Sequence, residues 1–232
     1  MNRSNTKINK TVMLAFAVLL ATTFGTQMLA QKNIHFGLKV VPGVYWLSST
    51  EDSTKNDGTR FGFGYGAMLE FGLTDNYYLV TGLDMVAAGA KSITDIKAGT
   101  IVGTSASNFN IQYLQIPLFL KMKTKEIGMI RYFGQFGLGS GFALSVKNSW
   151  TTTIGTTVTT GSDTKKDNIF PLRESLLIGL GLEFNIAGST SVVAGATFDN
   201  GFTPLLKKED SNGKSLPSLK SKGITFTVGV LF

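Results

Sequence analysis

The chain has 232 residues, no cysteine, one histidine and a formal net charge of +7. The lack of cysteine excludes disulfide bonds and thiolate chemistry. Three of the 22 basic residues and none of the 15 acidic residues lie within residues 1–30, so the remainder carries a net charge of +4. No cluster of lysine and arginine is interleaved with aromatic residues, so the sequence gives no support to a nucleic-acid partner.

Residues 1–30 have the layout of a secretory signal peptide. A basic start is followed by the short apolar run 12–21 and then by small or polar residues through Ala30. The run is shorter than the roughly 18 apolar residues that a spanning helix needs. We therefore predict cleavage near Ala30, with an uncleaved anchor as the alternative, and one domain over residues 31–232.

From residue 34 onward the sequence alternates with a period of two and shows no sustained helical period. Such alternation predicts strands that carry large apolar side chains on one face and glycine or polar side chains on the other. In the second strand, the aromatic residues from Phe61 to Tyr65 alternate with the glycines from Gly62 to Gly66. The eight predicted strands are 34–47, 61–73, 77–88, 110–123, 130–146, 173–186, 190–202 and 224–232.

The segments between these strands alternate between short and long. Outer-membrane β-barrels have short periplasmic turns and longer extracellular loops, so the alternation predicts periplasmic termini. The threonine-rich stretch 151–160 is expected to extend a hairpin, or to raise the strand number to ten if it joins the barrel wall. The short turns are 74–76, 125–128 and 187–189, and the long segments are 48–60, 89–109, 147–170 and 203–219.

The last predicted strand, 224–232, stops on an aromatic residue. This ending resembles the insertion signal of bacterial outer-membrane barrels, which implies the barrel-insertion machinery as a partner. The residues assigned to this signal are Phe226, Val228, Val230 and Phe232.

Alternation alone would also suit a soluble β-domain with its apolar faces turned inward. The glycines of the less apolar faces favour a barrel, because an exposed soluble face gains nothing from them, whereas a crowded lumen needs small residues. The predicted fold is therefore all-β, an eight-stranded antiparallel up-and-down transmembrane β-barrel in a bacterial outer membrane.

The segment Tyr113–Lys121, YLQIPLFLK, resembles the hallmark strand of the PorT-type outer-membrane β-barrel family. Residues 79–83 and 135–139 are similar to the strands that flank it in that family. The resemblance implies an integral outer-membrane protein. It also implies secretion-system proteins as partners, since the founding member is associated with the type IX pathway. Pro117 removes one ladder donor from this strand, so we expect a local bulge there, and another at Pro42.

The period-two assignment turns seven charged side chains toward the lumen. Isolated charges in a narrow lumen are costly, and eight strands leave room for side chains and little else. We therefore predict a polar network that plugs the barrel, with an ion path or a proton-handling carboxylate site as the alternative. The predicted members are Lys39, Glu70, Asp84, Lys121, Arg131, Glu183 and Asp199.

Catalysis has little support in the sequence. The single histidine, His35, lies at the same strand end as Asp75 and Ser189, but the sequence does not place these three residues in a catalytic arrangement. One histidine without cysteine or regularly spaced carboxylates also predicts no metal site. We predict no catalytic residue and no cofactor, and keep a barrel-borne hydrolase or acyltransferase as a remote alternative.

The long segments are the expected seat of a specific function, because rigid scaffolds commonly present binding residues on loops. The last one is basic, which suits contact with anionic lipopolysaccharide headgroups or with a protein partner. The expected role is non-catalytic, either envelope-structural or in surface interaction, or accessory to secretion. The alternative is a narrow pore for ions or small solutes. The basic residues are Lys207, Lys208, Lys214, Lys220 and Lys222.

Overall fold

The computed structural model describes residues 34–49, 54–98, 101–164, 169–207 and 218–232. The chain divides into two units, Met1–Ile34 and His35–Phe232. The second unit holds all ten strands, apart from Ile34, the first residue of the first strand. The predicted signal segment and its cleavage site lie outside the described residues. Within those residues there is no helix long and apolar enough to cross a membrane.

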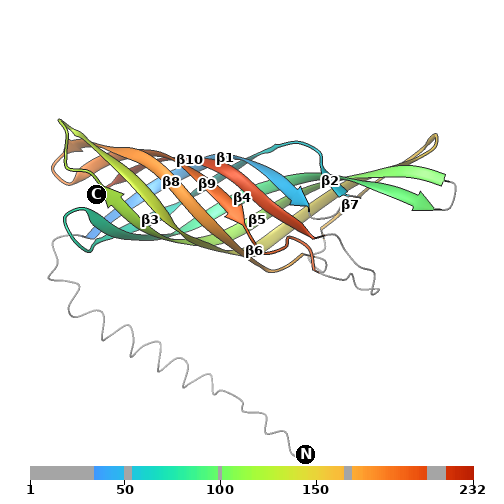
Figure 1. The fold of residues 1–232 in the computed structure, drawn as a ribbon, viewed down its shortest axis with the longest axis horizontal. Helices are drawn as coiled ribbons and strands as arrows, with labels where there is room; N and C mark the ends of the chain where they lie inside the picture. Colours follow the sequence, from blue (N-terminus) through green and yellow to red (C-terminus); the bar gives the residue numbers. More distant parts are fainter. Residues whose placement is uncertain (1–33, 50–53, 99–100, 165–168, 208–217) are drawn as a thin grey trace, which may run out of the picture. The chain divides into compact units, whose positions relative to one another are not determined.

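Ten strands form one sheet, and eight of them close into a ring (Figure 1). The order around the ring is β1-β10-β9-β8-β6-β5-β4-β3, and the strand registers that are assigned are all antiparallel. The predicted eight-stranded antiparallel barrel is confirmed. The strands are β1 Ile34–Ser49, β2 Thr54–Asn56, β3 Arg60–Gly72, β4 Tyr77–Ala98, β5 Ile101–Lys123, β6 Ile130–Ile154, β7 Thr157–Asp163, β8 Leu172–Ala187, β9 Thr190–Gly201 and β10 Leu219–Leu231.

Three strands are longer than predicted. β4, β5 and β6 extend well into the long polar segments 89–109 and 147–170, and these extensions project beyond the other strands (Figure 1). The hairpin expected from the threonine-rich stretch 151–160 is confirmed, because β6 and β7 pair there. Serine and threonine face one another across the extensions, and the hydroxyls of Ser105 and Thr152 are 3.2 Å apart. Threonine favours strands, and cross-strand hydroxyl pairs stabilise them. β7 pairs with β6 and β2 with β4, so neither strand joins the ring, which has eight members rather than ten.

The alternating residues of the strands point to opposite sides of the barrel wall, one set inward and the other outward. Large apolar side chains cover the outer surface, and Phe61 and Leu180 are 73% and 70% exposed. Glycine, polar side chains and a smaller number of apolar ones fill the interior. Near the C-terminus, Phe226 and Val228 of β10 face outward, while Thr225 faces inward and is buried.

Glycine is required where an inward aromatic ring lies against both neighbouring strands. The ring of Tyr45 lies against Gly62 on one side and Gly223 on the other, and a Cβ atom at either glycine would be 2.6 Å from a ring carbon. Both glycines therefore leave space for a buried tyrosine. In the short turns, Gly128 and Gly188 have φ values of +66° and +58°, which glycine adopts without strain.

The prediction of bulges at the two prolines is wrong. Across Pro117, the pairs of β4 with β5 keep one register, from Thr81 with Leu118 to Asp84 with Gln115. The β1–β10 register is likewise unchanged across Pro42. A proline removes one donor, but the pairs on either side hold the register. The Thr81 hydroxyl also donates a hydrogen bond of 2.9 Å to the Pro117 carbonyl.

The register shift in β5 lies between Gln112 and Tyr113 instead. Gln112 pairs with Ser145 and Tyr113 with Ala143, so Leu144 of β6 is the extra residue. The bulge marks the level at which the outer face of β5 and β6 changes from apolar to polar.

Candidate functional site

Four charged side chains form a cluster, here called the charge cluster, inside the end of the barrel that carries the short turns. Lys121 and Lys123 of β5 are two residues apart and therefore face the same way. The Lys121 Nζ atom is 2.5 Å from an oxygen of Glu70 and 2.5 Å from an oxygen of Glu183. The Lys123 Nζ atom is 2.6 Å from the other Glu70 oxygen and 2.8 Å from Glu183. All four side chains are buried, and Glu70 is 0% exposed.

Two aromatic rings complete the surroundings of these lysines. The Lys121 ammonium lies 4.1 Å from the centre of the Phe133 ring, and the Lys123 ammonium lies 4.0 Å from that of Tyr78. Each ring face attracts the cation above it. Two carboxylates and two ring faces therefore surround two ammonium groups, and the cluster joins side chains from β3, β4, β5, β6 and β8 across the lumen.

Two further ion pairs lie deeper in the lumen. Lys39 of β1 and Asp84 of β4 are 2.8 Å apart, and both are nearly buried. Arg173 of β8 donates two hydrogen bonds to Asp199 of β9, of 2.7 Å and 3.1 Å. This two-pronged geometry is the strongest that arginine makes with a carboxylate.

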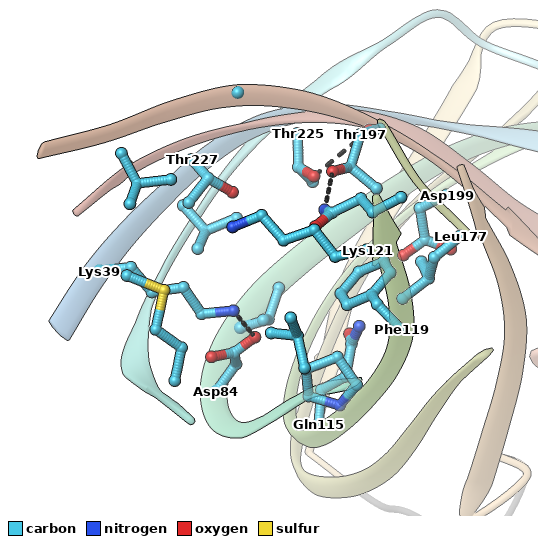
Figure 2. A pocket seen from close by; sticks show the side chains of 18 of the residues that line it. Lys39, Asp84, Gln115, Phe119, Lys121, Leu177, Thr197, Asp199, Thr225 and Thr227 are labelled. Carbon is cyan, nitrogen blue, oxygen red and sulfur yellow. Dashed lines mark hydrogen bonds and ion pairs between the residues drawn. The ribbon is translucent and has the colours of Figure 1, made fainter. Parts of the chain in front are cut away.

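A cavity of about 60 Å³ lies between the charge cluster and these pairs (Figure 2). Its volume is enough for about four to six water molecules at roughly 10–15 Å³ each. Figure 2 shows Lys39 and Asp84 pointing toward each other at its wall. The second carboxylate oxygen of Asp84, Oδ1, has no hydrogen-bond partner among the described residues. The cavity is small, and polar and apolar side chains contribute about equally to its lining.

An apolar layer, here called the apolar plug, closes the lumen toward the long hairpins. The segments around residues 169 and 205 meet there, because Ile169 pairs with Leu206 and the Phe170 N–H donates to the Leu205 carbonyl at 2.9 Å. These side chains pack on residues of the strands. The buried members are Ile169, Leu205, Leu206 and Leu219 with Tyr45, Leu47, Val86, Ala88, Phe109, Ile111, Tyr113 and Val146.

A family model described as outer membrane protein beta-barrel domain matches residues 5–207, most of the chain. The chain belongs to this family. It is therefore an outer-membrane β-barrel protein, and its exposed apolar surface is the face that meets lipid. A comparison with curated proteins found no match.

Solved structures of other barrels are similar to this one. Neisserial surface protein A (NspA) has 11% identity and a TM-score of 0.43 over 85% of this chain and 95% of its own. OprG from Pseudomonas aeruginosa has 10% identity and a TM-score of 0.44 over 86% and 94%. Ail, the attachment invasion locus protein of Yersinia pestis, has 13% identity and a TM-score of 0.39 over 87% and 100%.

The structure of this outer-membrane barrel brings together most of the seven charged residues singled out in the sequence. Glu70, Lys121 and Glu183 meet in the charge cluster, and Lys39 pairs with Asp84. Arg131 does not join them. It pairs with Glu126 at 2.7 Å and is 43% exposed, because it lies at the very end of β6 beside the short turn.

Sequence reasoning missed two lumenal cations. Lys123 lies two residues after Lys121 on the same face, so the alternation could have found it. Arg173 lies at the start of β8, two residues before the buried Ser175, and it is the partner of Asp199. With these two included and Arg131 left out, the ion pairs inside the described part of the barrel contain four cations and four carboxylates.

The structure does not assemble a catalytic group around His35. Its ring lies 6.4 Å from that of Tyr78, and its Nδ1 atom has no hydrogen-bond partner in the described part of the chain. Asp75 and Ser189 are both exposed. The described residues also contain no group of three or more histidine, aspartate or glutamate side chains that could hold a metal ion.

Proposed function

We propose that this protein is a non-conducting outer-membrane barrel, with an envelope-structural or surface-interaction role carried by its long hairpins. The observation that supports this proposal is the double closure of the lumen. The charge cluster fills one level, the apolar plug fills another, and the cavity between them is about 60 Å³.

The energetics of the charge cluster support a closed barrel. An ion that crosses this level must displace side chains that neutralise one another, which would leave charges unpaired in a buried position. Breaking one partner out of such a buried pair typically costs about 3–5 kcal/mol. The apolar plug is built mainly from aliphatic and aromatic side chains, so an ion that enters it loses most of its hydration without charged partners to replace the water.

We place the termini and short turns in the periplasm and the long hairpins outside the cell. A tilted strand needs about 9–11 residues to span a membrane. The outward apolar stretch Ile224–Phe232 fits that length, whereas β6 has 25 residues. The residues of β6 beyond that length project from the barrel at the end opposite Phe232. A protease site inserted at Gly155, the tip of the β6–β7 hairpin, should be cut in intact cells, whereas one at Gly128 should not.

We expect the N-terminal segment to direct export and the last strand to direct insertion. A signal peptide should be removed near Ala30, which N-terminal sequencing of the purified protein would test. The C-terminal strand should be recognised by the barrel-insertion machinery through Phe226, Val228, Val230 and Phe232. Phe232 closes the ring with Phe36 through backbone hydrogen bonds of 2.7 Å and 3.2 Å.

Planar-bilayer recording tests the closed lumen directly. Refolded protein should produce no reproducible conductance steps, because both closures would have to open together. Regular steps would favour the competing role, a narrow pore for ions or small solutes. A hydrolase or acyltransferase role would need an activity that His35→Ala abolishes.

An accessory role in a type IX-like secretion pathway is the second candidate. Its support is the resemblance of the segment Tyr113–Lys121 to the PorT-type family, together with hairpins that extend far from the wall. Cross-linking in intact envelopes, followed by purification of the protein, is the test. Recovery of secretion-machinery components would favour the accessory role, and their absence would favour a stand-alone surface protein.

A further inference from the structure

The outward faces of β4, β5 and β6 change character at one level. Below it, Met85 pairs with Leu114, and Leu114 with Phe142, so the surface is apolar. Above it, the next outward residue of β5 is Gln112, which pairs with Ser145. In the orientation proposed above, this level is where the outer leaflet's hydrocarbon ends and its headgroups begin.

Two lysines lie on this outward face just above the change, and an arginine whose position alternates with the inward side of β3 reaches the face from the side. Lys91 of β4 pairs with Asn108 of β5, and Asn110 of β5 pairs with Lys147 of β6. The two lysines flank β5 from opposite sides, with Cβ atoms about 12 Å apart by strand spacing and rise. Each side chain is long enough to reach the asparagines between them.

The third cation is Arg60, at the start of β3. Its side chain lies across Gly89 of β4 and donates a hydrogen bond to the Asn108 Oδ1 atom. Any side chain at position 89 would block this path, since a Cβ atom there would overlap the arginine. The glycine therefore lets a β3 arginine reach the outer face of β5.

These cations lack carboxylate partners. Within the part of the chain that the structure describes, none of Arg60, Lys91 and Lys147 forms an ion pair. Asp57 lies opposite Lys91 in the register that β2 keeps with β4, and its backbone N–H donates to the Lys91 carbonyl at 3.3 Å. It is the one carboxylate of the described residues placed directly beside these cations, and it forms no ion pair with them. The same face of β4 carries Asp95, but it is four residues further from the barrel wall, about 13 Å along the strand. With three cations against the single carboxylate of Asp57, the surface is still net positive and has asparagine donors at its centre.

We infer that Arg60, Lys91 and Lys147, with Asn108 and Asn110, form a binding site for the phosphorylated headgroup of an outer-leaflet glycolipid. The chemistry is that of phosphate recognition, in which arginine and lysine supply charge and amides supply directed hydrogen bonds. The patch faces away from the lumen at headgroup height, which is where a lipid phosphate lies and where a soluble anion has no advantage. This inference rests on the proposed orientation.

The site differs from the basic segment singled out in the sequence. Lys208 and Lys214 of that segment lie outside the described residues. Lys220 and Lys222 of β10 are also on the outward face, but β10 is four strands away from β5 around the ring, on the opposite side. The two surfaces can therefore be compared in one molecule.

The test titrates the refolded, detergent-solubilised barrel with diphosphoryl lipid A and counts bound lipid by native mass spectrometry. The variant R60Q/K91Q/K147Q should bind at least tenfold more weakly, since basic residues near a membrane each contribute substantially to the attraction of anionic lipid. The control K207Q/K220Q/K222Q removes the same charge on the far side and should change binding less than threefold. Equal losses in the two variants, or no loss in either, would overturn the site.

Two further controls are needed. One shows whether the site prefers a lipid phosphate to a free anion, and the other shows that each variant is folded. Dephosphorylated lipid A should bind at least tenfold more weakly than the diphosphoryl form, and equal binding would overturn the phosphate assignment. Inorganic phosphate should not displace the lipid, and complete displacement would assign the site to soluble anions. Each variant must first show the heat-dependent gel mobility of a folded barrel, and K147Q alone, at an exposed position, serves if the triple variant does not fold.

A failure of this site can be distinguished from a failure of the proposed function. Conductance steps would contradict the closed lumen and leave the lipid titration unaffected. Periplasmic hairpins in the protease test would contradict the orientation, and with it the headgroup assignment.

Discussion

The Lys121 ammonium lies 2.5 Å from a Glu70 oxygen across the lumen, between residues 51 positions apart in the chain. Neither side chain could be buried alone, because an unpaired charge in this position is expensive. Together with Lys123 and Glu183 they form a neutral unit. The interior of this barrel therefore depends on charges that come from β3, β5 and β8 and meet only after the ring has closed.

Removing one member of the charge cluster should destabilise the barrel strongly. Glu70→Gln keeps the shape of the side chain but leaves two lysines with one carboxylate, and we expect a loss of about 3–5 kcal/mol in the free energy of unfolding. Urea unfolding in lipid vesicles measures this. The matched control is Glu126→Gln, which breaks the exposed pair with Arg131 and should cost less than about 1 kcal/mol. Similar losses in both variants would contradict the assigned role of burial.

The charge cluster and the apolar plug should each be sufficient to block ion conductance. Replacing Leu205 and Leu206 by serine loosens the apolar plug but leaves the charge cluster, so bilayer recordings should still show no steps. Replacing Lys121 and Lys123 by alanine alone should also leave the barrel closed, because the plug remains. Steps are expected only when both changes are combined. Steps in the plug variant alone would show that the charge cluster does not block ions.

Tyr45 and its two glycine neighbours should behave as one packing unit. Gly62→Ala places a methyl group against the buried ring and against the Ala87 carbonyl oxygen, which should together cost about 1–3 kcal/mol. Adding Tyr45→Val should recover part of that loss, and a double-mutant cycle would reveal the coupling. Gly141→Ala is the control, since a Cβ atom there would have its nearest neighbour at 3.5 Å, an ordinary contact. Additive effects of the Gly62 and Tyr45 changes would argue against direct packing.

The terminal aromatic residue should matter more for assembly than for the finished barrel. Phe232 is half exposed on the outer face, so Phe232→Ser removes little buried surface. We expect the amount of folded barrel in cells to fall several-fold, measured by heat-dependent gel mobility, while unfolding of the purified variant changes by less than about 1 kcal/mol. Phe61→Ser, on the outer face at the other end, should leave assembly near normal. Equal assembly of the two variants would remove the proposed signal.

Much of the fold could be predicted because the direction of a side chain in a strand depends only on local alternation. The outward residues of β3 and the inward placement of Glu70, Asp84 and Lys121 follow from a period of two, whatever the neighbouring strands do. The strand ends were harder to predict. The threonine-rich stretch 151–160 could be predicted to extend a hairpin, but the polar residues 89–109 gave no such signal, and only their pairing between β4 and β5 makes them strands.

The sequence by itself determined that this chain closes into a glycine-lined barrel, and which faces of its strands meet lipid and lumen. The tertiary structure alone decided that Arg173 pairs with Asp199, that Arg131 stays at the rim and that Arg60 crosses Gly89 to reach Asn108. The physical reason is that contacts between strands depend on their relative stagger, which is set when β1 pairs with β10 and the ring closes.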